Sequence, residues 1–407
     1  MEPGQDREGR SAGPAGRGLL AAPLLEEIRA QAERADRTRD IDPSVIAAIK
    51  STDLMVMAAT KELGGTEASA GEIGEELAAI APACASTAWC LWNHLAVFHL
   101  YCSTLGPANG DLLREIVARH EWVSFPGGAG SRTHGRIEGD EVVLNGRGGF
   151  GTSARYGEWT AVAFSVLGDD GEPFDPPDLR FTIVRTDDRG VTIEPTWDGM
   201  SLRASATDTV HYAEVRVPLG RCAPWYGVHR AGQLRESTLE VISDRYRDDW
   251  VGLADIWLAG MACAVVQAAL DDAADEIRTR RAIMSAAMTG FDTVSRNLGD
   301  AAGRVEAARG AVADRLASID ARLTAGRWPT DADEIATQAV AVAALDQADT
   351  AMRLLHRTLG GTALRESGTF ERRWRDMQAM TVHINAHPDR VHVAHGRHLL
   401  GLEPGRF

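Results

Sequence analysis

The sequence has few cysteines and no motif that would use them in pairs. The five cysteines are odd in number, and none of them stands in a Cys-x-x-Cys pair or in a cysteine–histidine zinc spacing. Secreted domains that depend on cysteine usually carry even sets of disulfides. We therefore expect reduced thiols and a cytoplasmic protein.

Positive charge is also scarce. The 407 residues include 43 Lys and Arg against 58 Asp and Glu, which gives a formal charge of −15 and a pI near 5.3. Nucleic acids and anionic membranes are bound by clustered Lys and Arg. The composition therefore argues against both partners and favours a small molecule. The chain is long enough for two or three packed units.

Neither a signal peptide nor a membrane span is expected. Residues 1–18 are rich in glycine, proline and charge and lack an apolar core, so we expect a disordered tail. Residues 77–110 have no charged side chain, but Pro82, Asn93 and the histidines among them would be costly in lipid. We predict a fully buried helix over 86–104 instead.

Three domains are predicted from the changing periodicity. Residues 19–121 have helical patterns, with helix starts at Asp42-Pro43 and at the capping box Ser69-Ala70-Gly71-Glu72. Residues 122–228 contain short β-branched runs between turn signals and predict antiparallel strands. Residues 229–407 predict an antiparallel four-helix bundle. Its helices are expected near 246–285, 291–325, 331–359 and 370–386, followed by a short one at 389–400.

The stretch 357–397 combines histidines, a glycine pair, an Arg-Asp step and aromatic residues. Phe370, Trp374 and Met377 fall at helical spacing and predict one packed face, whereas His383 falls on the opposite side. An imidazole with a pKa near neutrality is suited to proton transfer.

Three histidines near the C-terminus have a spacing that raises the question of a metal site. They are His392, His395 and His398. No HExxH motif and no carboxylate-bearing ligand set accompanies them, so no metal site is predicted. A Rossmann nicotinamide site is not indicated either, because no GxGxxG motif follows a strand.

Four segments carry a family resemblance: ACASTAWCLWNHLA at 83–96, EGDEVVLNGRGGFGTSA at 138–154, WDGMSLRASATDTVHYAEVRVP at 197–218 and FERRWRDMQAMTVHINAHPDR at 370–390. Over about residues 20–402 the chain resembles the acyl-CoA dehydrogenase fold. Within it, the chain is most similar to two-component flavin-dependent monooxygenases, which include aromatic hydroxylases, dibenzothiophene monooxygenase and aminosugar N-oxygenases. The resemblance implies an α+β, mostly α fold: an N-terminal helical domain, a central antiparallel β-barrel and a C-terminal four-helix bundle.

The segment after Arg375-Asp376 distinguishes two activities of this superfamily. Dehydrogenases usually carry a carboxylate base there, in an I-x-E-G-T motif, but this chain has no carboxylate before Asp389. The resemblance therefore implies a monooxygenase that receives reduced FMN or FAD, with FMN slightly favoured, from a separate reductase. With O2 the flavin would form a C4a-(hydro)peroxide that oxygenates a small organic substrate at carbon, nitrogen or sulfur. Hydroxylation of an aromatic ring or N-oxygenation, in secondary metabolism, is the expected reaction.

Two alternatives to a monooxygenase stay open. The first is an acyl-CoA dehydrogenase or oxidase whose catalytic base has moved to another helix. The second is a helical scaffold that no longer binds flavin. The resemblance also implies a homo-oligomer, either a tetramer or a dimer.

The resemblance implies a set of catalytic residues. His383 would hydrogen-bond the flavin adduct or the substrate. His94, in the buried helix, would lie near the substrate or the flavin edge, and its neighbours Asn93 and His99 compete for that role. A hydroxyl of the FGTS segment would contact the flavin, and either of two residues could supply it. These residues are Thr152, which aligns with the family serine, and Ser153.

Cofactor-binding residues are implied in the same way. Ser124 matches the strand end that contacts the flavin ring, and Arg281 aligns with an arginine of the dehydrogenases that binds the flavin tail. The pair Gly360-Gly361 resembles glycines that let the flavin of a neighbouring subunit approach the backbone. Arg375, of the Arg-Asp step, completes the predicted set.

Overall fold

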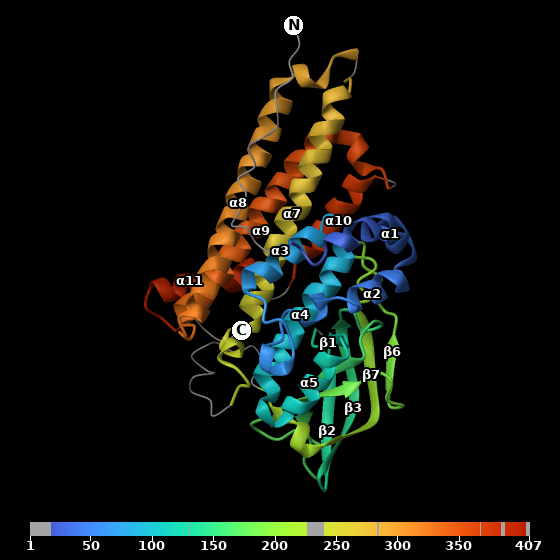
Figure 1. Cartoon of the computed structure of the whole chain (residues 1–407), viewed down its shortest axis with the longest axis vertical. Coiled ribbons are helices and arrows are strands. Elements are labelled where there is room, and N and C mark those ends of the chain that lie inside the picture. The colour runs from blue at the N-terminus through green and yellow to red at the C-terminus, as the bar shows by residue number, and fades with distance from the viewer. Residues whose placement is uncertain are drawn as a thin grey trace.

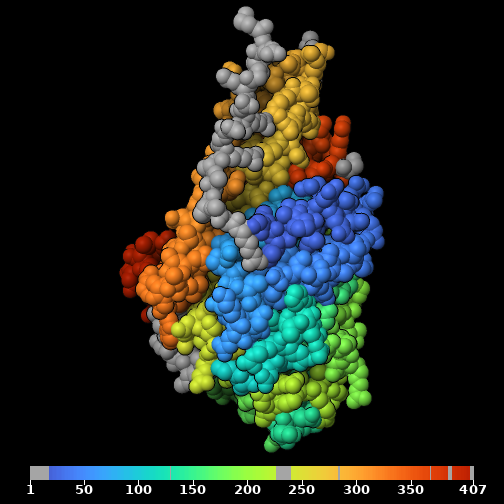
Figure 2. Space-filling view, viewed as in Figure 1, coloured from blue at the N-terminus to red at the C-terminus, as the bar shows by residue number. Residues whose placement is uncertain are grey.

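A computed structural model describes residues 18–128, 130–225, 240–282, 285–366, 368–383 and 387–403. Figure 1 shows a long helical bundle at one end of the molecule and a twisted sheet at the other. In Figure 2 the N-terminal helices, coloured blue, lie between these two parts. The predicted tail up to residue 17 and the end of the predicted helix 370–386 lie outside the described residues.

The N-terminal helices begin where the sequence places their caps. The Asp42 side chain accepts a hydrogen bond from the Ser44 amide with Pro43 at N1, and Ser69 and Glu72 form the predicted capping box. The predicted buried helix is α4, whose side chains are almost all enclosed. The helices are α1 (Leu25–Thr38), α2 (Pro43–Lys50), α3 (Ala70–Ile80), α4 (Ala85–Leu105) and α5 (Gly110–Ala118).

The β-domain contains one mixed sheet with the strand order β6-β7-β3-β2-β4-β5-β8, and β1 pairs with β4. Most neighbours are antiparallel, as predicted, but β4 runs parallel to both β1 and β2. Among the described residues, no ladder joins β6 to β8 to close a barrel. The strands are β1 (Val123–Ser124), β2 (Arg132–Glu138), β3 (Glu141–Gly151), β4 (Trp159–Val166), β5 (Leu179–Arg185), β6 (Val191–Glu194), β7 (Asp208–Pro218) and β8 (Ala223–Pro224).

A bulge interrupts the pairing of β3 with β7 between Gly148 and Gly151. Within it, Phe150 adopts a left-handed conformation with φ of 57°, and its side chain is 55% exposed. A Cβ on Gly148 would lie 2.3 Å from the carbonyl oxygen of Pro126, so only glycine allows this close approach. The bulge therefore turns an aromatic ring out of the sheet.

The C-terminal helices agree with the predicted bundle, with one difference. The helix predicted over 370–386 ends at Thr381 as α10, so His383 lies just beyond its end. The helices are α7 (Trp250–Thr279), α8 (Asp292–Thr324), α9 (Asp331–Leu359), α10 (Thr369–Thr381) and α11 (Pro388–Leu399). Among the described helices, α7 alone is long and apolar enough to cross a membrane, and 78% of its most apolar window is buried inside the molecule.

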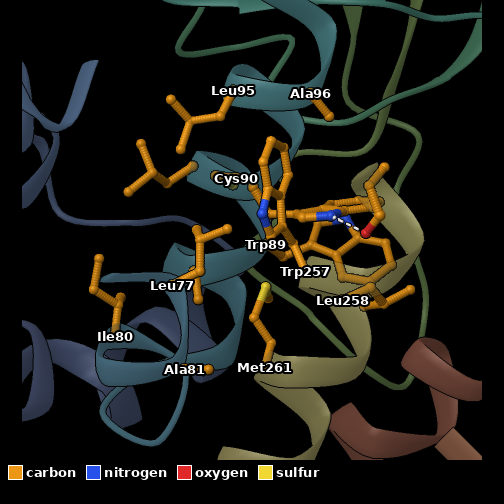
Figure 3. Close-up of a cluster of buried hydrophobic side chains, with 14 of the residues drawn as sticks. Leu77, Ile80, Ala81, Trp89, Cys90, Leu95, Ala96, Trp257, Leu258 and Met261 are labelled. Atoms are coloured by element: carbon orange, nitrogen blue, oxygen red, sulfur yellow. Dashed lines mark hydrogen bonds between the residues drawn. The ribbon is translucent and has the colours of Figure 1, made fainter. Parts of the chain in front are cut away.

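The main core holds α4 against α7. In Figure 3, Trp89 and Trp257 pack among Leu77, Leu258 and Met261, which come from α3 and α7. The Trp257 indole also donates a 2.9 Å hydrogen bond to the Ala70 carbonyl. Burial of such large rings stabilises the packing by about 2–3 kcal/mol each. This core fixes the face of α4 that the site uses.

Candidate active site

His383 lies against two tryptophans of α4. Its ring centroid is 5.5 Å from that of Trp89 and 5.2 Å from that of Trp92, and both contacts are edge-to-face. The side chain is half-buried, but its Nδ1 atom is enclosed and has no hydrogen-bond partner. The predicted histidine is therefore presented to an aromatic site with one ring nitrogen free to bond.

Burial changes the charge that was expected for His383. Removal from water lowers its pKa to about 4, and the positive charge of Arg390 adds to the effect. The expectation of a pKa near neutrality was wrong, because the tryptophans that exclude water come from a distant part of the chain. At neutral pH the imidazole is uncharged and can donate one hydrogen bond and accept another.

The Arg-Asp step holds α10 in place. The Arg375 guanidinium donates to Asp36, to Glu371 and to the Met200 carbonyl. The Asp376 carboxylate accepts a 2.7 Å hydrogen bond from the Leu202 amide. The prediction that Arg375 binds the cofactor does not fit, since these partners occupy its donors. Both side chains instead tie α10 to the segment that precedes β7.

The two hydroxyls of the FGTS segment face different surroundings. The Thr152 hydroxyl accepts a 3.2 Å hydrogen bond from the Trp89 indole and lies 3.1 Å from the Thr207 hydroxyl. The Ser153 hydroxyl instead donates to the Cys90 carbonyl at 3.3 Å, and the side chain is fully buried. The structure therefore separates the two candidates: Ser153 is turned into the core, and Thr152 faces the site.

A cavity of about 450 Å³ opens beside Thr152. Small-molecule sites usually have volumes of ~300–1,000 Å³. Its lining includes Arg147, Phe150, Trp197, Asp198, Thr207 and Thr209. Thr207 links this cavity to Thr152, and Trp89 links Thr152 to His383. A continuous series of contacts thus runs from the cavity to the imidazole.

Comparison with known proteins identifies the kind of site. A family model described as "Acyl-CoA dehydrogenase, C-terminal domain" matches residues 256–388. The flavin-dependent monooxygenase oxygenase subunit HsaA of Mycobacterium tuberculosis is 25% identical over 94% of both chains. The probable acyl-CoA dehydrogenase YngJ of Bacillus subtilis is also 25% identical, over 88% of this chain and 90% of its own.

Solved structures share the fold over nearly the whole chain. XiaF from Streptomyces sp., in complex with FADH2, superposes with a TM-score of 0.80 at 20% identity and covers 95% of this chain and 98% of its own. FMN-bound TdsC from Paenibacillus sp. A11-2 gives a TM-score of 0.77 at 18% identity, with 94% and 96% covered. The chain has the acyl-CoA dehydrogenase fold and is similar over nearly its whole length to flavin-dependent monooxygenases.

The cavity beside Thr152 fits a flavin chemically. Phe150 and Trp197 offer an aromatic wall for a planar ring, and Thr207 offers a hydroxyl that Thr152 orients. Arg147 adds an exposed cation for a phosphate. The residues around the cavity therefore suit both the ring and the charged tail of the cofactor.

His94 has no ring nitrogen left for catalysis. Its Nδ1 accepts from the Val123 amide at 3.1 Å, and its Nε2 lies 2.8 Å from the Met55 carbonyl, so Nε2 carries the proton. Burial lowers its pKa to about 4. The predicted catalytic role was wrong, and the residue joins α4 to β1. His99 is engaged in the same way with the Asp248 carbonyl.

Ser124 also differs from its predicted role. Its side chain is fully buried and donates to the Trp159 carbonyl at 3.3 Å, while its own carbonyl accepts from Tyr101. Ser124 does not line the cavity beside Thr152. The turn that follows it, from Phe125 to Gly127, lines a separate cavity of about 210 Å³.

Arg281 and the glycine pair lie at the other end of the bundle. The neighbouring Arg280 donates to the carbonyl of Leu359, next to Gly360-Gly361. Arg281 itself is exposed and donates to the Ser285 carbonyl. Figure 1 places this end of α7 far from the sheet. The structure therefore separates these predicted residues from Thr152 and His383 within one chain.

Three residues of the site were missed by sequence reasoning. Thr207 lies in the quoted segment 197–218 but carries no distinguishing pattern of its own. Asn93 was considered only as a competitor of His94, although it shares a helix face with Trp89 and Trp92. Asp255 had a signal that could have revealed it, because it is the only charged residue between Val251 and Leu270.

Proposed function

We propose that this protein is the oxygenase component of a two-component system, which binds reduced flavin from a separate reductase and inserts one atom of O2 into a small organic substrate. The observation that carries the proposal is the position of His383. It follows the Arg375-Asp376 clamp, where dehydrogenases have a carboxylate, and it lies against Trp89 and Trp92. The name of HsaA as an oxygenase subunit supports a separate reductase.

The residues of the chain have distinct tasks in this proposal. Phe150 and Trp197 hold the planar ring, and the hydroxyls of Thr207 and Thr152 bond its polar edge. When bound, the reduced flavin supplies the electrons that activate O2. The two tryptophans exclude water, which would otherwise promote loss of hydrogen peroxide. His383, uncharged at neutral pH, donates or accepts a hydrogen bond beside the reacting atoms.

The proposal leaves FMN slightly favoured over FAD. XiaF carries FADH2 and TdsC carries FMN, so the neighbours support either flavin. The cavity beside Thr152 has a single cation, Arg147, among the residues that line it, which matches one terminal phosphate. Arg281 and Gly360-Gly361 would then serve the tail of a longer cofactor, from a second protomer.

We also propose a homo-oligomer, most simply a tetramer, in the cytoplasm. Exposed apolar side chains on α11 and directly after it, including Val393, Leu399 and Leu400, favour association with another copy. The described cysteines are all free, which suits a reducing compartment.

The test is incorporation of oxygen from isotopically heavy O2. The protein, an unrelated flavin reductase and a panel of phenols and aromatic amines are incubated together, and products are analysed by mass spectrometry. One heavy oxygen atom in a product supports the proposal. Product without the heavy atom, or consumption of O2 solely as hydrogen peroxide across the panel, contradicts it.

A second candidate function is an acyl-CoA dehydrogenase with a relocated base. It is favoured by Asp255, a fully buried carboxylate on α7, and by the likeness to YngJ. An acyl-CoA added anaerobically to protein with oxidised flavin would bleach the flavin in this case. The proposed monooxygenase leaves the flavin oxidised.

A further inference from the structure

Asp255 is a buried carboxylate without a partner. Its side chain is completely enclosed, and neither of its oxygens has a hydrogen-bond partner in the described part of the chain. Burying a carboxylate in this way costs several kcal/mol, and protein interiors rarely leave such a group unbonded. The enclosure and the lack of partners are what a group that receives a ligand would show.

Asp255 lies at the His383 site. The carbonyl of the preceding residue, Ala254, accepts a 2.8 Å hydrogen bond from the indole of Trp92, and the Trp92 ring meets the edge of His383. The charge of Arg390, on α11, acts on both Asp255 and His383. The hydrogen bond from Trp92 therefore holds α4 against α7 one residue from this carboxylate.

A second acceptor without a partner in the described chain lies on α4, beside the two tryptophans in sequence. Asn93 is one residue from Trp92 and four from Trp89, so these three residues share one face of the helix. The Oδ1 atom of Asn93 is enclosed and has no hydrogen-bond partner among the described residues. The enclosed Nδ1 of His383 is likewise without one. Four enclosed polar atoms without a partner in the ranges that the structure describes thus lie on the elements that meet at the aromatic site: both oxygens of Asp255, Oδ1 of Asn93 and Nδ1 of His383.

These atoms select a ligand group by their chemistry. A carboxylate, an amide oxygen and the basic nitrogen of an imidazole all accept hydrogen bonds. An ammonium offers three donors and a positive charge, and the faces of Trp89 and Trp92 attract cations. A hydroxyl offers one donor and no charge. Burial raises the pKa of Asp255 and so favours the neutral acid; a bound ammonium would stabilise the charged carboxylate, whereas an anion would not.

We propose that Asp255 binds the ammonium group of an amine-bearing aromatic substrate, with Asn93 as the second acceptor. The claim that this substrate is oxygenated rests on the proposed function, whereas the claim that Asp255 binds its ammonium group does not. An ammonium paired with a carboxylate has no lone pair to react. The atom that is oxygenated therefore lies elsewhere in the substrate, such as on the aromatic ring.

Calorimetric titration with three matched phenols tests the proposal directly. Tyramine, tyrosol and 3-(4-hydroxyphenyl)propionate differ mainly in bearing an ammonium, a hydroxyl or a carboxylate, and each is titrated into the protein with and without oxidised flavin. We expect tyramine to bind at least about tenfold more tightly than tyrosol, and the carboxylate to bind most weakly. Equal affinities, or no binding of tyramine, would overturn the proposal.

Substitutions assign the preference to Asp255. Asp255→Asn keeps the shape and removes the charge, so the advantage of tyramine over tyrosol should fall to within about twofold. Asp271→Asn, on an exposed part of the same helix, should keep it. Full preference in Asp255→Asn would refute the assignment. Should that variant not fold, Asn93→Ala is tested in its place. We expect it to bind tyramine more weakly and tyrosol as tightly as wild type does. An equal loss of affinity for both ligands would contradict the proposal.

The titrations need neither reduced flavin nor O2. A protein that prefers tyramine but forms no oxygenated product would therefore keep the binding inference and lose the proposed function. If phenols without an amine are oxygenated and the titrations show no preference for tyramine, the proposed function is kept and the binding inference is lost.

Discussion

His383 is an uncharged hydrogen-bonding group throughout the neutral pH range. Its ring is enclosed by Trp89 and Trp92, and the pKa of about 4 means that protonation occurs only in acid. Because the buried ring is harder to protonate in the folded than in the unfolded protein, its ionisation also affects the free energy of unfolding. Because the folded pKa is below the unfolded value, this residue lowers stability as pH falls from about 6.5 to about 4.

Replacement of His383 by alanine tests its part in oxygen transfer. The variant loses the hydrogen bond beside the reacting atoms, so we expect about a hundredfold less product per reduced flavin, with hydrogen peroxide released instead. The measurement is the ratio of product to peroxide. The control is His387→Ala, which replaces an exposed histidine nearby and should keep the wild-type ratio. Equal ratios in the two variants would show that His383 has no part in the mechanism.

Thr152 and Ser153 form a matched pair of variants. Thr152→Val removes the hydroxyl between Trp89 and Thr207, and we expect flavin affinity to fall about tenfold, because a loss of about 1.4 kcal/mol is typical for one such bond. Ser153→Ala should retain affinity, since its hydroxyl faces the Cys90 carbonyl. Fluorescence titration of flavin decides. Greater loss in Ser153→Ala would reverse the assignment.

The sequence could locate His383 but not distinguish it from His94 on physical grounds. Both are histidines in helical, apolar surroundings, and the family resemblance favoured each. What separates them is tertiary: a strand amide and a distant carbonyl bind both nitrogens of His94, and such partners are not adjacent in sequence. The partners of Arg375, including Asp36, were hidden for the same reason.

At the scale of elements, α10 is fixed by its attachment to the β-domain. Asp376 is enclosed and accepts from the Leu202 amide, and burial raises its pKa to about 7. The folded state therefore holds the proton more tightly than the unfolded chain does. The stability from this group is complete below about pH 4 and is lost as pH rises toward about 7.

Asp376→Asn isolates this effect. The amide oxygen can still accept from Leu202, but it cannot ionise, so the variant should gain stability relative to wild type as pH rises from 4 to 8. The gain is at most roughly 4 kcal/mol, from a shift of about three pKa units. Urea unfolding at several pH values measures it. A difference between variant and wild type that is constant with pH contradicts the account.

Element boundaries were predictable where local chemistry sets them. The caps at Asp42 and Ser69 are read from short-range side-chain bonds, and the structure confirms both. The parallel pairing of β4 with β2 could not be read in this way, because it depends on how the chain crosses between strands. The end of α10 at Thr381 was also missed, since the apolar pattern continues past it.

At the scale of the molecule, the predicted cofactor residues fall at two ends of the bundle. Asp255 and the C-terminal end of α7 at Thr279 are separated by roughly 35 Å along the helix axis. A single flavin cannot contact Thr152 and Gly360-Gly361 of the same chain. The composition and periodicity gave the order of the domains, but this separation emerges only from the lengths and packing of the helices.

Mixed oligomers test whether a second protomer completes the site. With reduced FAD, whose longer tail would reach the second protomer, His383→Ala and Gly361→Trp should each be inactive, the first in chemistry and the second at the tail of the cofactor. When the two are co-expressed, about a quarter of the sites should combine a wild-type His383 with a wild-type Gly361 from the other chain. Recovery of activity in the purified mixture is expected. No recovery, despite mixed oligomers by mass spectrometry, would contradict a shared site.

The most direct test of the central claim is to mix the protein and reduced FMN, prepared without oxygen, with oxygenated buffer and to follow the absorbance. The account predicts that bound flavin reoxidises through a lasting phase whose spectrum is neither that of reduced nor that of oxidised flavin, and that His383→Ala shortens this phase. Reoxidation at the rate and with the spectra of free flavin, in both wild type and variant, would contradict it.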